Sequence, residues 1–163
     1  ATGYDAMTGP LLNLNIETPK ASLKSYWEEG PRNYLGLAIP GFPNLFTITG
    51  PGSPSVLSNM PVSIEQHVDW ITECIAHCIE TGCTSIEAQE QSAEIWTDHV
   101  RETADATLLP KVQHSWYLGA NIPGKPRVFM PYAGGLNIYR KICNNVAEEG
   151  YKGFNLKSGK TTS

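Results

Sequence analysis

The sequence lacks the motifs of a self-contained nucleotide-binding or hydrolytic enzyme. Neither G-x-G-x-x-G nor G-x-x-x-x-G-K followed by Ser or Thr occurs in its 163 residues, so no segment has the spacing of a phosphate-binding loop. No G-x-S-x-G elbow is present, and the four histidines form no H-E-x-x-H pair. The carboxylates are spread over faces that we expect to be exposed to solvent, so nothing in the sequence supports a catalytic site with two carboxylates. These absences exclude the hydrolase classes that such motifs define.

Strong charge and long apolar runs are also absent. Lys plus Arg number 12 and Asp plus Glu number 16, so the net charge is −4, and no basic block suits a nucleic-acid backbone. No apolar run is long enough to span a bilayer, and the first residues have no signal-peptide pattern. We therefore expect a cytoplasmic protein without a membrane span or a nucleic-acid partner. The chain begins without Met, as a fragment or a processed product would.

Cysteines are few, and their arrangement indicates thiols rather than a metal centre. Cys74 and Cys78 lie four residues apart in an expected helix, and with His67 or His77 nearby they offer a candidate metal site. The spacing fits no common zinc motif, and free cysteine is often buried as a small apolar residue. Since no export signal is present, we expect reduced thiols and no metal.

Apolar residues are arranged with both helical and strand periods. An apolar fraction of 40% and a charged fraction of 17% are typical of a globular domain. The patterns predict helices over residues 62–81, 90–107 and 135–149, and strands over 11–16, 34–39, 45–49 and 85–88. In the second helix, the residues expected to face inward are Ile95, Trp96, Val100, Thr103 and Ala104. The sequence therefore predicts an α/β fold.

Two loops stand out as candidate functional segments. Residues 50–55, Gly-Pro-Gly-Ser-Pro-Ser, follow a predicted strand, and α/β folds place ligands at the carboxyl ends of strands. An ordinary tight turn is the alternative for such a loop. Residues 109–133 are rich in proline and aromatic residues, and a loop of that length is usually functional or disordered. Its aromatic content argues against disorder.

Four segments carry a family resemblance. They are ATGYDA at 1–6, GFPNLF at 41–46 with GPGSPSVLSNM at 50–60, SIEQHVDW at 63–70, and SWYLGANIPGK at 115–125. In order and spacing, up to about residue 155, they resemble the Baeyer–Villiger monooxygenases, a family that includes the phenylacetone, steroid and cyclohexanone monooxygenases. The second segment is most similar to the phenylacetone and steroid branch.

The resemblance implies the carboxy-terminal portion of a Rossmann-like FAD-binding domain, in a flavoprotein with two dinucleotide-binding domains. Residues 1–108 would belong to the FAD domain and include a flavin- and substrate-lining loop at 50–60. Residues 109–133 would be a mobile lid loop that contacts NADP, and 134–163 a terminal helix and tail. The parent enzyme would use FAD, NADPH and O2 to convert a ketone into an ester or lactone.

The resemblance also implies roles for individual residues. Met60 and Asn59 would contact FAD, and Trp116, Asn121 and Lys125 would contact NADP. The ketone pocket would be lined by Pro54, Ser55, Val56, Leu57 and Ser58. The family's flavin fingerprint, its NADPH-binding crossover, its F-x-G-x-x-x-H motif and its active-site arginine would all precede residue 1. Arg127 and Arg140 match other positions, so we expect no catalytic residue here, and we expect the isolated chain to be inactive with weak or no FAD affinity.

Two alternatives remain at this point. The chain could be a non-catalytic module that pairs with a separate chain bearing the nucleotide fingerprints, which would require a sizeable exposed apolar surface. It could also come from a flavin monooxygenase that acts on sulfur or nitrogen. Those relatives resemble the start of this chain but usually lack the segment around Trp116.

Overall fold

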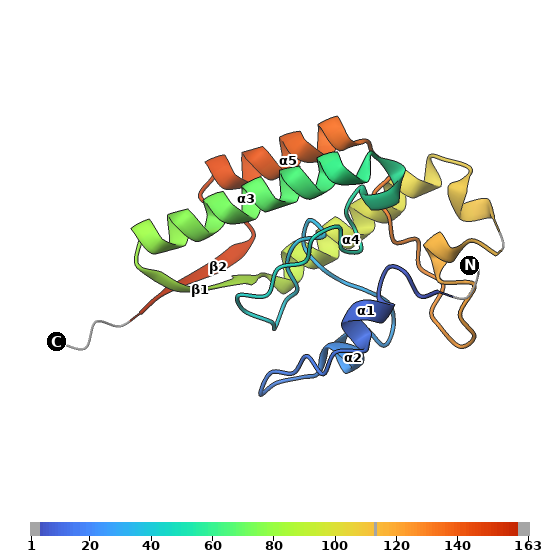
Figure 1. Cartoon of the computed structure of the whole chain (residues 1–163), viewed down its shortest axis with the longest axis horizontal. Helices are drawn as coiled ribbons and strands as arrows, with labels where there is room; N and C mark the ends of the chain where they lie inside the picture. The colour runs from blue at the N-terminus through green and yellow to red at the C-terminus, as the bar shows by residue number, and fades with distance from the viewer. Residues whose placement is uncertain (1–3, 113, 160–163) are drawn as a thin grey trace.

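Two long helices lie side by side over a two-stranded sheet and a third helix (Figure 1). The computed structural model describes residues 4–112 and 114–159. Helix α3 (Met60–Glu80) packs along α5 (Leu136–Glu148), and strand β1 (Cys83–Ala88) pairs antiparallel with β2 (Phe154–Ser158). Helix α4 (Glu90–Asp105) follows β1. The short helices α1 (Gly9–Leu12) and α2 (Leu23–Tyr26) lie together on the opposite side.

The three predicted helices are confirmed, with ends within two residues of those expected. Helix α3 has Pro61 in its first turn, where a missing N–H costs nothing, and it ends before Gly82, whose φ of 67° suits glycine best. In α5, Tyr139, Cys143 and Val146 are buried, as the helical spacing indicates. Local periodicity and end signals were therefore sufficient to place the helices.

The buried side of α3 is not its most apolar side. Three polar residues, Ser63, Gln66 and His67, are among the residues that the helix buries, whereas most of the recurring aliphatic residues face outward. Their exposed fractions are 38% for Ile64, 42% for Val68, 47% for Ile75 and 74% for Ile79. Trp70 is buried because it packs toward α5, where its indole N–H donates to the Cys143 carbonyl oxygen at 2.9 Å.

One inward-facing residue of α4 was predicted wrongly. Trp96, Val100 and Ala104 are buried, but Ile95 is 63% exposed. Neighbouring helical residues point about 100° apart, so burying Trp96 turns Ile95 toward the edge of the helix. The larger aromatic side chain decides the orientation of α4.

The strands were predicted less well than the helices. β1 is confirmed, but residues 11–16 begin in helix α1, and residues 34–39 and 45–49 form only isolated bridges at Tyr34, Ala38 and Phe46. The run 34–39 is buried as expected, yet Leu35 has a φ of 58°, which bends the chain. Strand β2 was missed. A strand needs a neighbour to bond its backbone groups, and the described residues provide a continuous partner only for β1 and β2.

The core is dominated by aromatic side chains between the helices and the sheet. Trp70, Trp96, Tyr132, Tyr139 and Phe154 belong to one buried cluster. A second cluster lies around Trp27 and Phe42, and a third joins residues 109–133 to the end of α4. The third contains Ala104, Leu118 and Phe129. No described helix is long and apolar enough to cross a membrane. The mixed α/β class is confirmed, whereas membership of an FAD-binding domain stays a prediction.

Candidate functional site

Three segments far apart in the sequence meet at one end of the molecule. The loop after residue 50 bonds to the 115–133 region, since Gly52 N–H donates to the Met130 carbonyl oxygen at 2.6 Å. Tyr132 N–H donates to the Ser53 carbonyl oxygen at 2.8 Å. The amino-terminal segment joins them, because Ser55 Oγ donates to Met7 Sδ at 3.7 Å. All three of these segments overlap regions that carry the family resemblance. Residues 1–3 of the first region and the side chain of Val56 lie outside the described part.

The loop 50–60 is largely buried and is held by internal hydrogen bonds. Ser53 Oγ donates to the Gly50 carbonyl oxygen at 2.7 Å, and Ser58 Oγ donates to the Ser55 carbonyl oxygen at 2.9 Å. Ser55 has a φ of 42°, a left-handed conformation that costs energy for a residue with a side chain. Such strain persists only where the surroundings impose it, as they often do at functional sites.

The predicted pocket residues do not all face the same way. Pro54 and Ser55 are buried inside the loop, whereas Leu57 is 36% exposed and Ser58 is half-buried. Leu57 is part of a single 3-10 turn, Ser55–Leu57, that precedes α3. Among the described side chains of that group, Leu57 is therefore the most accessible apolar one, whereas Pro54 and Ser55 at the start of the turn are buried.

The predicted flavin-contacting residues begin helix α3. Asn59 is the exposed cap residue, and its carbonyl oxygen accepts from Ser63 N–H at 3.1 Å. Met60 is the first helical residue and is partly buried. The first N–H groups of a helix have no acceptor within the helix, and its N-terminal end carries a partial positive charge. Together these features suit an electron-rich group placed against the start of α3.

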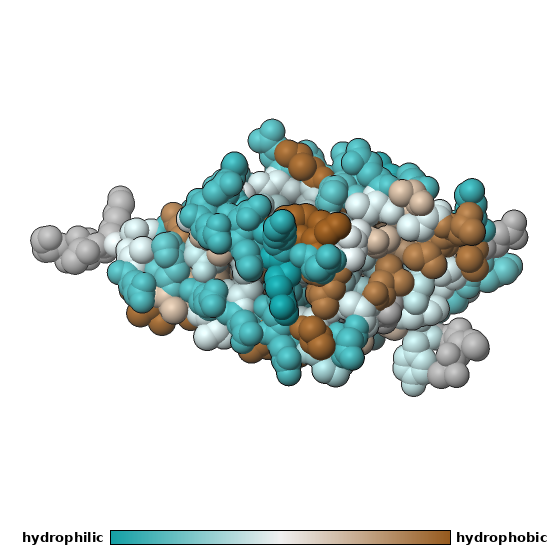
Figure 2. Space-filling view, turned by 90° about the horizontal axis from the view of Figure 1, so that it is seen from above, coloured by the Kyte–Doolittle hydropathy of each residue, from teal (hydrophilic) through white to brown (hydrophobic). Residues whose placement is uncertain are grey.

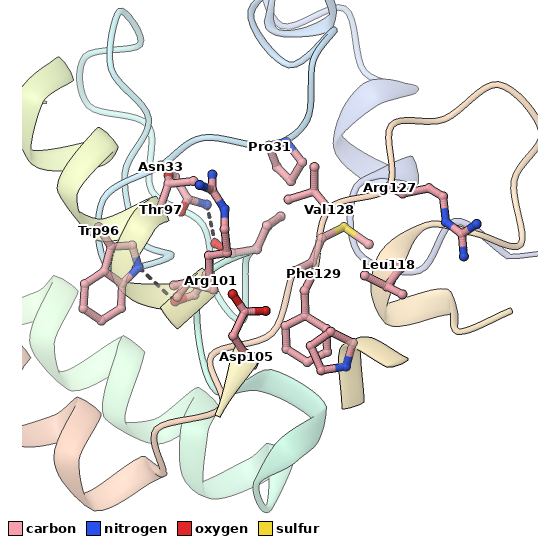
Figure 3. Close-up of a pocket in the computed structure, with 15 residues that line it drawn as sticks. Pro31, Asn33, Trp96, Thr97, Arg101, Asp105, Leu118, Arg127, Val128 and Phe129 are labelled. Carbon is pink, nitrogen blue, oxygen red and sulfur yellow. Dashed lines mark hydrogen bonds between the residues drawn. The ribbon is translucent and has the colours of Figure 1, made fainter. Parts of the chain in front are cut away.

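A cavity of about 340 Å³ lies beside the loop, between α4 and residues 127–130 (Figure 3). Asn33 Nδ2 donates to the Pro51 carbonyl oxygen, and Trp96 Nε1 donates to the Gly52 carbonyl oxygen at 3.0 Å, so both side chains hold the loop in place. The loop needs glycine at position 52, because its φ is 84° and an added Cβ would lie 2.8 Å from Asn33 Oδ1. Sequence patterns gave no signal for Asn33.

The predicted NADP-contacting residues have different surroundings from one another. Trp116 is half-buried, and its ring lies 4.5 Å from that of Tyr117. Asn121 Nδ2 donates to the Tyr4 carbonyl oxygen at 2.8 Å. The Lys125 ammonium donates to Asp5 and, at 2.6 Å, to Thr8 Oγ1. Two of the three predicted residues therefore bond to the amino-terminal segment.

Asp5 is a residue that the sequence did not single out. Burial raises the pKa of its carboxyl, but hydrogen bonds from Lys125 and Thr8 and the charge of Lys125 outweigh burial and hold the pKa below its ordinary value. The side chains of Lys125 and Asp5 are only 12% and 21% exposed. The signal that could have found the pair is that both residues lie in segments of the family resemblance.

The cysteines and His67 show no arrangement of a metal centre. Within residues 4–112 and 114–159, no group of three or more His, Cys, Asp or Glu side chains is placed to hold a metal ion. Cys74 is buried, which raises the pKa of its thiol to about 12. His67 is also fully buried, and its Nδ1 accepts from Thr49 N–H at 3.0 Å.

The sequence is similar to several curated monooxygenases, although no family model matches it. Cyclohexanone 1,2-monooxygenase of Acinetobacter sp is 40% identical over 96% of this chain and 28% of that protein. A Baeyer–Villiger monooxygenase of Pseudooceanicola batsensis is 41% identical over 93% of this chain and 27% of its own length. Phenazine N-monooxygenase of Lysobacter antibioticus is 39% identical over 97% of this chain and 29% of that protein.

Solved structures agree with these relatives. A structure of oxidized steroid monooxygenase bound to NADP matches 98% of this chain and 30% of its own, with a TM-score of 0.88 and 49% identity. A structure of OTEMO in complex with FAD and NADP matches 96% of this chain and 29% of its own, with a TM-score of 0.88 and 34% identity. The chain therefore belongs to the Baeyer–Villiger monooxygenase family, and it spans less than a third of the length of these relatives.

Proposed function

We propose that this chain provides one wall and the lid of the active site in an FAD- and NADPH-dependent monooxygenase that converts a ketone into an ester or lactone. The observation that carries the proposal is the convergence of the amino-terminal segment, the loop 50–60 and the segment 115–130, each hydrogen-bonded to another. Each of these segments overlaps one through which the chain resembles its family. Bound flavin supplies the redox chemistry and the activation of O2.

The start of α3 fits the flavin ring as one wall of its site. Met60 would present its backbone N–H, and Asn59 is exposed beside it. The positive end of a 21-residue helix would favour electron density on the ring edge. The sequence contains no glycine-rich phosphate-binding motif for the pyrophosphate of FAD. The chain therefore fits the ring edge and leaves the dinucleotide to another part of the protein.

The substrate and lid roles follow from the same arrangement. Leu57 and Ser58 would face the ketone, and the buried residues Pro54 and Ser55 would keep that surface in place. The expectation that Val56 lines the ketone pocket concerns a side chain outside the described part. Trp116, on its own turn, would lie over NADP when the segment 109–133 closes. Closing such a segment excludes water from a reactive site and completes its set of contacts.

The exposed side of α3 supports a larger assembly. Ile64, Val68, Ile75 and Ile79 are each at least 38% exposed along one side of the helix. Figure 2, which looks down on the side of α3 and α5, shows apolar side chains between hydrophilic ones. In the relatives, the chain that lies outside the matched region is more than twice as long as the matched region itself. We infer that the nucleotide-binding remainder of the enzyme covers this side of α3.

The test compares the chain by itself with a longer protein that includes it. The purified chain should show no flavin absorbance at one equivalent, whereas the longer protein should bind FAD and oxidise NADPH in the presence of a ketone. A Leu57→Phe variant of the longer protein should change the relative rates among ketones and leave FAD content unchanged. Stoichiometric FAD on the chain alone, or a longer protein that oxygenates no ketone, would contradict the proposal.

Oxidation of nitrogen is a second candidate. The phenazine N-monooxygenase is as similar to this chain, at 39% identity, as the cyclohexanone enzyme, at 40%. Sequence similarity therefore does not separate the two reactions. A substrate panel of ketones, thioethers and aromatic N-heterocycles, scored by product mass, distinguishes them, because only ketone oxygenation yields an ester.

A non-catalytic module is a third candidate, favoured by the same exposed side of α3. Such a module would pair with a separate chain that bears the nucleotide fingerprints. Co-expression with such a chain, followed by size-exclusion chromatography, tests pairing directly. Replacement of Ile64 and Ile75 by Lys should abolish the complex, because charged residues would enter an apolar interface. A complex that forms without ketone oxygenation would favour this candidate.

A further inference from the structure

A largely buried charge pair joins the amino-terminal segment to the segment that carries Trp116. The ammonium of Lys125 donates to the Asp5 carboxylate and to Thr8 Oγ1, the latter at 2.6 Å. Lys125 and Asp5 are 12% and 21% exposed, and Thr8 is 1% exposed. The two charged residues are 120 positions apart in the sequence, so only the folded chain brings them together.

The aliphatic part of Lys125 lies directly on the turn that presents Trp116. Gly119 follows that turn with a φ of 68°, and its N–H donates to the Trp116 carbonyl oxygen at 3.0 Å. A Cβ at Gly119 would lie 3.0 Å from Cδ of Lys125 and 3.4 Å from its Cγ. The lysine stem therefore packs against the Gly119 backbone, and a displacement of Lys125 would be transmitted to the Trp116 turn.

Further contacts hold the same turn from both sides. Asn121 Nδ2 donates to the Tyr4 carbonyl oxygen at 2.8 Å, beside the Lys125 contact. On the other side, Leu118 and Phe129 are buried against Ala104 of α4. The turn is therefore attached to the core by apolar contacts and to the amino-terminal segment by polar ones, which include the charged pair of Lys125 and Asp5.

We propose that Lys125 and Asp5 form a clasp that positions the Trp116 turn, and that the Lys125 ammonium serves this clasp instead of contacting NADP. An ammonium has three donors, and residues of this chain already accept from two of them. If Lys125 turned away toward a cofactor phosphate, it would leave a partly buried carboxylate without its counter-ion, which is costly. The importance of Trp116 rests on the proposed function, whereas the clasp itself concerns only this chain.

Hydrogen exchange of the chain tests the clasp without any cofactor. Lys125→Met and Asp5→Asn should each raise amide exchange in residues 115–125 roughly tenfold, as expected for loss of a charge-assisted hydrogen bond. The double variant should exchange no faster than Lys125→Met, because both changes remove the same interaction. Lys111→Met, an exposed lysine nearby, is the matched control and should have no effect. Additive effects, or unchanged exchange in Lys125→Met, would overturn the proposal.

A titration separates positioning from a general loss of stability. The pKa of the Asp5 carboxyl, followed by carbon NMR, should rise in Lys125→Met and be restored toward its low value in Lys125→Arg. Thr8→Val leaves both charges in place and should raise amide exchange in residues 115–125 less than Lys125→Met does. If Lys125→Met folds poorly, Thr8→Val still tests the clasp. An Asp5 pKa that does not respond to Lys125 would refute the clasp.

Cofactor selectivity tests the second half of the proposal in the longer flavoprotein. Lys125→Met and Asp5→Asn should weaken binding of NADP and NAD by the same factor, so the preference between them stays unchanged. A contact of Lys125 with the 2′-phosphate, which NAD lacks, predicts a selective loss of NADP binding in Lys125→Met alone. A contact with the pyrophosphate that both nucleotides share predicts that Lys125→Met weakens both while Asp5→Asn weakens neither. Either result would overturn the proposal. If the longer protein binds neither nucleotide, the proposed function fails while the exchange result still decides the clasp.

Discussion

Protonation of His67 is expected to destabilise this chain strongly as the pH falls. The imidazole is fully buried between α3 and α5, where its ring lies 5.5 Å from that of Tyr139. Its Nδ1 accepts from Thr49 N–H at 3.0 Å, and its Nε2 has no hydrogen-bond partner among the described residues. A proton on Nδ1 would break the first bond and place a charge in an apolar core.

Burial lowers the pKa of His67 from 6.5 to about 4. Because the folded pKa is depressed, the unfolded chain takes up the proton first, and folding stability is fully present only above about pH 6.5. The stability is lost progressively as the pH falls from 6.5 toward 4. At about 1.4 kcal/mol for each pKa unit, the total loss is about 3 kcal/mol, a large share of the stability of a typical domain.

Urea unfolding between pH 7 and pH 4 measures this loss. The His67→Gln variant removes the titrating ring and should be less stable at pH 7, but its stability should fall by about 3 kcal/mol less than that of the unmodified chain over this range. His114→Gln, which replaces an exposed histidine, is the matched control for the loss of a histidine as such. Parallel pH profiles for the unmodified chain and His67→Gln would refute the reasoning.

Three further predictions concern the loop, the helix pair and the thiols. Gly52→Ala should lower the free energy of unfolding by more than about 2 kcal/mol, because a Cβ would collide with Asn33 and Trp96. Gly41→Ala shares the positive φ but has nothing within 4 Å, so a similar loss there would show that the collision is unimportant. Trp70→Phe should cost about 1–3 kcal/mol in chemical denaturation, since it removes the buried bond to Cys143; a loss under about 0.5 kcal/mol would count against that bond. In the native state Cys74 and Cys143, both fully buried, should resist alkylation while the partly exposed Cys83 reacts, as read by peptide mass.

The orientation of α3 shows where sequence patterns stop being sufficient. Helical spacing placed the helix correctly, because that signal acts within a few residues of the chain. The residues that recur at helical spacing are aliphatic, and most of them are exposed, yet the buried side carries His67 and Trp70. Which side is buried depends on α5, whose Cys143 carbonyl oxygen accepts from Trp70.

The strand β2 shows the same limit for a different reason. Residues Phe154–Ser158 contain few of the β-branched residues that favour strands, so the local pattern did not predict one. Their extended form results from pairing with β1, where Ile86 lies opposite Leu156, seventy residues later. Conversely, residues 45–49 have strong strand propensity, but among the described residues their ladder pairing is limited to an isolated bridge at Phe46.

By itself, the sequence determined the helices, the strand β1, the α/β class and the family, because these depend on local periodicity and on motifs read in order along the chain. Only the tertiary structure decided that α3 leaves its aliphatic side outward, and that Lys125 and Asn121 bond to the amino-terminal segment. Those contacts join residues more than a hundred positions apart, and their partners are selected by burial and geometry that no local pattern encodes.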